Sequence, residues 1–201
     1  MEDQLPLSDI RITVPPAALP LFTTVLQSGI EVKVPHGKTL GKFLNTFPGF
    51  TAEYLADTVQ TIFLNGTAVD DLTLPLTGSN PVLALSAAMP GLAGAIFRKN
   101  SFHSALRTET NALGSESVQQ ESITVTLKLF NSIARERGEE MLKSGLCIKA
   151  DLLAGFLTKR PNLLQQILNI HFGKNEMDQG EFLRILPTLS RVNLYVVGTN
   201  D

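Results

Sequence analysis

The chain has 201 residues, of which 43% are hydrophobic and 18% are charged, and its formal net charge is −2. This apolar content can build one ordinary domain or two small ones, and it argues against a disordered chain. A near-neutral chain lacks the basic surplus of a nucleic-acid-binding protein. The single cysteine, Cys147, excludes an internal disulfide and a cysteine-rich zinc site.

The sequence predicts no membrane span and no signal peptide. No uncharged apolar run reaches the roughly 18 residues that a membrane span needs. The first residues, Met1-Glu-Asp-Gln4, are acidic and therefore unlike a signal peptide. We expect a soluble, cytoplasmic protein that binds neither membrane nor nucleic acid.

Charge is unevenly distributed along the chain. Met1–Ile96 holds eight acidic and four basic residues, a net of −4, whereas Phe97–Ser115 holds three basic and one acidic, a net of +2. The stretch Thr108–Glu121 is polar and free of aromatic residues, which is typical of a linker. We therefore predict a first domain at 1–96, a basic, aromatic connector with a polar linker at 97–121, and a second domain at 122–201.

In the first half, alternating or continuous apolar runs predict four strands, at Ile10–Val14, Gly29–Val34, Val59–Leu64 and Pro81–Ser86. Thr39 is a suitable N-cap for a helix that carries Leu40, Phe43 and Leu44 on one face. Asn65-Gly66 predicts a tight hairpin, because a type I′ turn needs two residues with positive φ.

The second half repeats this order. Strands are predicted at Ser122–Phe130, Leu146–Ala150, Ile170–Phe172 and Arg191–Val197, and Asp151 is expected to cap the helix. The segment Leu142–Ala150 matches Leu26–Val34 nearly position by position, an offset of 116 (142 − 26). The turn after Ile170 matches the one after Ile62, an offset of 108 (170 − 62). We interpret this as an internal duplication with a period of about 112 residues.

The duplication predicts two cores. In the first unit the expected buried residues are Val32, Leu40, Phe43, Leu44, Ile62, Leu64, Val82 and Leu85. In the second unit they are Leu127, Leu129, Leu153, Phe156, Leu157, Ile170, Val192 and Leu194.

The order strand, strand, helix, strand-turn-strand, strand resembles the ubiquitin-like β-grasp fold, so we expect an α+β protein of two tandem β-grasp domains. Ile123-Thr-Val-Thr-Leu-Lys-Leu-Phe130, followed by Ile133-Ala-Arg-Glu-Arg-Gly138, resembles the opening of the sulfur carriers of molybdopterin and thiamine biosynthesis. Phe63–Val69 resembles that family's Val-Asn-Gly turn. Val82–Gly94 resembles its last strand and its Pro-x-x-Gly-Gly tail.

The resemblance implies a carrier whose terminal glycine carries sulfur, yet Gly91 and Gly94 are followed by more than 100 residues. We therefore predict a non-catalytic interaction or adaptor protein. The alternative is a degenerate or proteolytically processed sulfur carrier. A third option, an enzyme with a site between the modules, has no residue that points to it.

Residues with catalytic side chains are scattered. His36 lies in a Pro-His-Gly turn, and His171 and Cys147 each alternate with apolar residues on a predicted strand. Asp70 and Asp71 are adjacent, so on a strand they would point to opposite sides. We expect no catalytic residues, no cofactor and no metal site.

The segment from Ala87 to Arg107 begins small and apolar and then becomes basic and aromatic. We predict that it binds a protein partner of unknown identity, with a positive rim suited to an acidic surface. The expected contact residues are Gly91, Gly94, Phe97, Arg98, Lys99, Phe102, His103 and Arg107. Other readings remain open: a connector that packs on the first domain, an anion contact, or docking on the same domain of a second copy in a homodimer.

Overall fold

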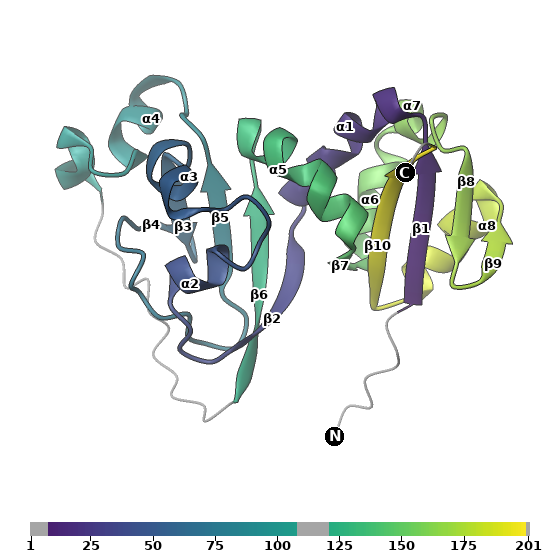
Figure 1. Ribbon diagram of the computed structural model, residues 1–201, viewed down its shortest axis with the longest axis horizontal. Helices are drawn as coiled ribbons and strands as arrows, with labels where there is room; N and C mark the ends of the chain where they lie inside the picture. Colours follow the sequence, from purple (N-terminus) through teal and green to yellow (C-terminus); the bar gives the residue numbers. More distant parts are fainter. Residues whose placement is uncertain (1–7, 108–120, 200–201) are drawn as a thin grey trace. The chain divides into compact units, whose positions relative to one another are not determined.

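The computed structural model describes residues 8–107 and 121–199, and it is an α+β structure with two five-stranded sheets (Figure 1). The first half contains β1 (Ser8–Val14), η1 (Pro16–Ala18), α1 (Leu19–Phe22), η2 (Thr23–Gln27), β2 (Ile30–Pro35), α2 (Leu40–Leu44), α3 (Ala52–Asp57), β3 (Thr61–Leu64), β4 (Thr67–Ala68), β5 (Val82–Ser86), α4 (Gly91–Phe97) and η3 (Phe102–Leu106). Among the described residues, no helix has the length and apolar character to cross a membrane.

The second half contains β6 (Ser122–Leu129), α5 (Asn131–Ser144), β7 (Leu146–Lys149), α6 (Ala150–Thr158), α7 (Pro161–Leu164), β8 (Asn169–Phe172), β9 (Asn175–Met177), α8 (Gln179–Ile185), η4 (Leu186–Thr188) and β10 (Arg191–Gly198). The predicted linker falls almost wholly at 108–120, outside the described residues.

Each sheet contains a strand from the other half of the sequence. One sheet has the order β2-β6-β5-β3-β4, and the other has the order β7-β10-β1-β8-β9. Strand β6 pairs parallel with β5, where Leu127 lies opposite Leu83. Strand β1 pairs parallel with β10, where Ile12 lies opposite Val196. The first strand of each half therefore completes the sheet of the other half.

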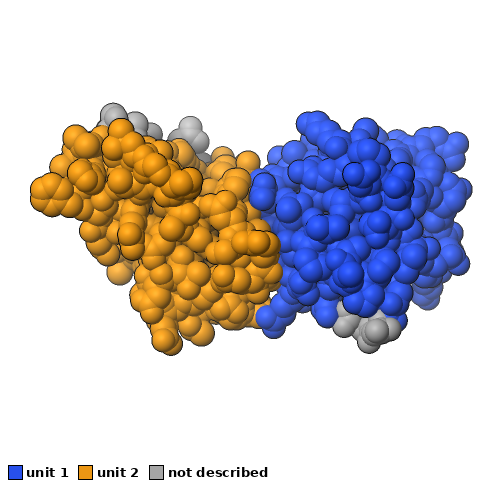
Figure 2. Space-filling view, turned by 90° about the horizontal axis from the view of Figure 1, so that it is seen from above, with its two compact units in different colours: residues 1–30, 138–201 blue, residues 31–137 orange. Residues whose placement is uncertain are grey.

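The compact units follow this exchange. Unit 1 is drawn from residues 1–30 and 138–201, and unit 2 is drawn from residues 31–137 (Figure 2). This division differs from the predicted boundaries at 96 and 122, because β1 belongs with the second half and β6 with the first. Unit 2 is thus a continuous stretch of chain inserted into unit 1.

The core follows strand alternation, with three differences from the prediction. In β6 the inward residues are Ile123, Val125, Leu127 and Leu129, all buried, and all eight residues predicted for the second core are buried. Leu127 and Leu129, however, lie in unit 2. Val82 was expected to be buried and is 37% exposed, because the inward positions of β5 are Leu83 and Leu85. Val32 is only half-buried.

The predictions that depend on a few neighbouring residues, a hairpin turn and two helix starts, agree more closely with the structure. Asn65 and Gly66 have φ angles of 51° and 82° and join β3 to β4, as the hairpin prediction required. Helices α2 and α6 begin at Leu40 and Ala150, next to the predicted starts. Asp151 is not the cap residue, which is Lys149; it lies in the first turn, where its carboxylate accepts a hydrogen bond from the Leu152 N–H.

Two features were not expected from the sequence. Residues 16–27, between two predicted strands, form three short helices. Helix α5 is 14 residues long and continues through Gly138 to Ser144. Gly138 is needed there because a Cβ at this position would lie 2.6 Å from the Thr23 Cβ.

Candidate partner-binding site

The segment predicted to contact a partner folds as α4 and η3 in unit 2. Gly91 begins α4 with a φ of +75°, a conformation that favours glycine. Gly94 is buried in the same helix, and a Cβ there would lie 1.8 Å from the Met89 carbonyl oxygen. Both glycines are therefore used to form a helix rather than an extended tail.

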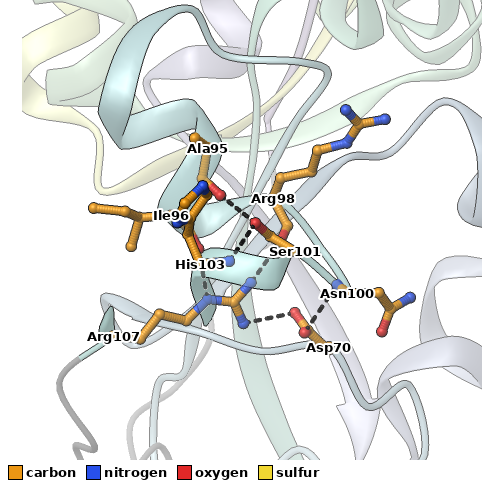
Figure 3. A network of polar contacts seen from close by, with 8 residues as sticks. All are labelled: Asp70, Ala95, Ile96, Arg98, Asn100, Ser101, His103 and Arg107. Atoms are coloured by element: carbon orange, nitrogen blue, oxygen red, sulfur yellow. Dashed lines mark hydrogen bonds and ion pairs between the residues drawn. The ribbon is translucent and has the colours of Figure 1, made fainter. Parts of the chain in front are cut away.

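Arg107 fixes the end of this segment with three hydrogen bonds (Figure 3). Its Nη1 donates to the Asp70 carboxylate at 2.8 Å, its Nε to the Ile96 carbonyl at 2.9 Å, and its Nη2 to the Arg98 carbonyl at 2.6 Å. The Arg107 side chain is only 14% exposed. A guanidinium that bridges α4 to the β4 side of the unit in this way is unavailable to a partner.

The turn between α4 and η3 is held by the same aspartate. Asn100, whose φ is 52°, donates its backbone N–H to Asp70 Oδ2 at 3.1 Å. The Ser101 hydroxyl donates to the Ala95 carbonyl and accepts the His103 N–H at 3.1 Å. Asp70 thus binds two points of the segment, and Ser101 ties its two helices together.

Lys99 and Arg98 attach the segment to α3 and to the residue before β3. The Lys99 ammonium donates to the carbonyls of Leu55 and Ala56, at the C-terminal end of α3 where such oxygens lack helical partners. Burial lowers the pKa of Lys99, while Asp70 and Asp57 oppose that shift. Arg98 Nε donates to the Gln60 side-chain oxygen at 2.7 Å.

The aromatic residues of the segment divide into an inner and an outer one. The Phe97 ring packs on Phe63 of β3, with ring centroids 5.3 Å apart. Phe102 is 95% exposed and makes an edge contact with the His103 ring at 5.6 Å. Leu92 and Leu106 are 71% and 65% exposed. The outer side of the segment therefore carries large apolar side chains.

All eight predicted contact residues lie in this one segment, but the structure gives most of them internal roles. The three cations form hydrogen bonds within unit 2. Lys99 and Arg107 are partly buried there, whereas Arg98 remains exposed, so the expected positive rim keeps one exposed cation. Sequence reasoning missed the anchors Asp70 and Gln60, which are 37 and 38 residues from their arginine partners. It also missed Leu92 as an exposed residue. The net negative charge of residues 1–96 was the sequence signal that the basic connector could bind to residues of the first half.

The other candidate residues do not converge. His36 is exposed in its turn, His171 lies on β8, and Cys147 is half-buried on β7. Asp71 is exposed, and hydrogen bonds from Thr73 lower the pKa of its carboxyl. Within residues 8–107 and 121–199, no group of three His, Cys, Asp or Glu side chains could hold a metal ion.

A second polar cluster lies between α3 and the start of α5 in unit 2. The Tyr54 hydroxyl donates to Glu136 Oε2 at 2.8 Å, and the Arg137 guanidinium lies 3.9 Å from the Tyr54 ring centroid. Burial and the Glu136 carboxylate raise the pKa of Tyr54 to about 12. Gly49 makes room for Arg137, because a Cβ there would lie 2.2 Å from Nη1. This cluster attaches α5 to α3.

Comparison with known proteins adds no relative: no protein-family model, curated protein or solved structure matches this chain. Any function proposed for the chain therefore rests on its own residues.

Proposed function

We propose that the chain is a non-catalytic protein-interaction or adaptor protein that binds a protein partner through α4 and η3. The observation that carries the proposal is Phe102, a large aromatic side chain almost fully exposed on a segment that polar contacts hold in place. Exposed aromatic residues on a fixed scaffold are the anchors that dominate interface energies, and they lose little conformational entropy on binding.

We further propose that the modules are ubiquitin-like. The segments that carry the β-grasp resemblance come from both halves of the sequence, and they meet in unit 2. These are β6 and the start of α5 from the second half, and the Asn65-Gly66 hairpin, β5 and the tail to Gly94 from the first. Their meeting in one unit supports one complete β-grasp module made by exchange.

Two of the basic residues form hydrogen bonds within unit 2, so the proposed contact with a partner is apolar rather than electrostatic. Arg107 and Lys99 are bonded within unit 2, whereas Leu92, Phe102 and Leu106 face outward. The partner is therefore expected to offer an apolar pocket rather than an acidic surface. Binding of this kind depends weakly on salt, since exposed charges contribute little to it.

The alternative, a processed or degenerate sulfur carrier, has less support. Carrier tails must be thin and free to enter a partner's active site, but Gly94 is buried in α4 beside the Met89 carbonyl. An intact mass corresponding to a chain that ends at Gly91 or Gly94, or to its thiocarboxylate, would favour this alternative.

Affinity capture with the full chain as bait tests the proposal. The variant combines Leu92→Ala, Phe102→Ala and Leu106→Ala. The matched control combines Leu21→Ala and Leu168→Ala, two exposed apolar positions of unit 1. We expect the first variant to lose the partners that wild type and control both retain, at an unchanged melting temperature. Retention of every partner by the first variant would place the interaction elsewhere.

A further inference from the structure

One face of the unit 1 sheet carries a row of polar side chains directly opposite one another. Tyr195 of β10 lies opposite Arg11 of β1, Arg11 lies opposite His171 of β8, and His171 lies opposite Glu176 of β9. The three inner strands are neighbours in the sheet (Figure 1). Ile10, Ile12 and Val14 of β1 point to the core, so Arg11 and its row occupy the other face, where none of the four is buried.

Backbone packing and a hydrogen bond fix the position of the Tyr195 side chain in this row. Its ring lies against Gly145, whose φ is +93° and where a Cβ would come within 2.5 Å of the ring. Asn193 Nδ2 donates to the Tyr195 hydroxyl at 2.8 Å and also to Asp9 Oδ1 at 3.0 Å. The phenol oxygen accepts this bond, so its own proton is left to donate to another acceptor.

Arg11 is the second donor of the row. Its guanidinium carbon lies 4.9 Å from the Tyr195 ring centroid, so the side chain leans toward β10 and away from Glu176. Stacking of this kind orients the planar guanidinium. Among the described residues, the Arg11 guanidinium has no ion-pair or hydrogen-bond partner, and the side chain is exposed.

The carboxylates of this face are already engaged. Asp9 accepts from Asn193, and Glu176 accepts a hydrogen bond from the Asn169 side chain. The positive charge of Arg11 is therefore not cancelled by a direct contact, and the ring that carries the Tyr195 hydroxyl lies beside it.

We infer that Arg11 and Tyr195 form a binding site for one oxyanion, a phosphate or carboxylate group, on the open face of the unit 1 sheet. The guanidinium presents paired N–H donors that match two oxygens of such a group, and the phenol adds a third donor. Hydrogen bonds to a charged group in this geometry are among the stronger ones in proteins. This site is independent of the α4–η3 segment.

Tyrosine labelling gives a direct test, because the chain has two tyrosines, Tyr54 and Tyr195. With ring-labelled tyrosine in the full chain, the Tyr195→Phe variant assigns the two sets of NMR signals. Inorganic phosphate or acetate is then added at constant ionic strength, with chloride as the replaced salt. We expect the Tyr195 signals to shift saturably while those of Tyr54 stay in place and report the intact fold.

Arg11→Gln should weaken this binding by roughly ten-fold or more, since it removes a charge-assisted contact. Lys174→Gln is the matched control, an exposed lysine of the β8–β9 turn with the same change in charge, and it should alter binding by less than about two-fold. Saturation by phosphate alone favours a phosphorylated ligand, saturation by acetate favours a carboxylate ligand, and either supports the site. No saturable shift with either anion, or equal losses in the two variants, overturns it.

Discussion

Arg107 and Asp70 are 37 residues apart in the sequence, and their side chains form an ion pair with an Nη1–Oδ1 distance of 2.8 Å. Both are partly shielded from water, and Asp70 also binds the Asn100 N–H. We expect Asp70→Asn to lower the free energy of unfolding by about 1–3 kcal/mol, because Arg107 loses its charged partner in a partly buried position. Chemical denaturation measures the loss.

The neighbouring Asp71→Asn is the matched control for this change. Among the described residues, Asp71 accepts side-chain hydrogen bonds only from Thr73 and is exposed, so the substitution should cost much less. A double-mutant cycle with Arg107→Gln should give a coupling energy between positions 70 and 107 and none between 71 and 107. Equal effects at the two aspartates would contradict the anchoring role of Asp70.

Two helix glycines should respond in opposite directions to the same substitution. Gly94→Ala places a Cβ against the Met89 carbonyl, and we expect a loss of about 1–3 kcal/mol from the backbone shift that follows. Gly155→Ala in α6 meets no atom within 4 Å, so it should stabilise by about 0.5–1 kcal/mol through higher helix propensity. Thermal denaturation of both variants checks the difference in sign.

Because β1 and β6 each pair with strands of the other half, a cavity in either strand should destabilise the sheet to which that strand belongs. Ile12→Ala in β1 and Leu127→Ala in β6 each remove a fully buried side chain and should cost about 2–5 kcal/mol. Hydrogen exchange should then rise in β8 and β10 for the first variant, and in β3 and β5 for the second. The opposite pattern would favour two tandem domains.

The Tyr54 hydroxyl should lose its proton at a higher pH than an ordinary tyrosine does. Its pKa rises from the ordinary 10.0 to about 12, so the folded state favours the neutral phenol. The corresponding stability is fully present below pH 10 and is lost as pH rises from about 10 toward 12. Absorbance of tyrosinate in wild type and Tyr54→Phe should show the late step only in wild type. Over the same pH range, wild type should lose more stability than the variant.

The sequence was sufficient for features set by near neighbours. The Asn65-Gly66 turn needs two positive φ values, and the alternation in β6 needs one buried face; both are visible within a few residues. Which strands pair, by contrast, depends on contacts between segments that are far apart in the sequence. Since β1 and β6 both alternate buried and more exposed residues, either strand suits either sheet, and the sequence does not tell exchange from a tandem order.

The sequence predicted which segment forms the candidate site, but not which of its side chains face inward. Clustering of Phe97, Phe102 and the cations located it between Gly91 and Arg107. Which ring faces inward depends on Phe63, and which cation is neutralised depends on Asp70. Both are distant in sequence, so periodicity within the segment could not identify them. The Tyr195–Arg11 pair was missed for the same reason, because its members are 184 positions apart (195 − 11).

The insertion of unit 2 into unit 1 affects synthesis on the ribosome. Strand β1 is made before the other strands of unit 1 but lies between β10 and β8, and β10 ends at Gly198. At ribosomal rates of about 5–20 residues per second, β1 waits roughly 10–30 s for its neighbours, while all of unit 2 is completed in between. During that interval Ile10, Ile12 and Val14 lack the strands that cover them in the folded unit, and exposed apolar segments of this kind are ones that chaperones bind and that aggregate when chaperones are scarce.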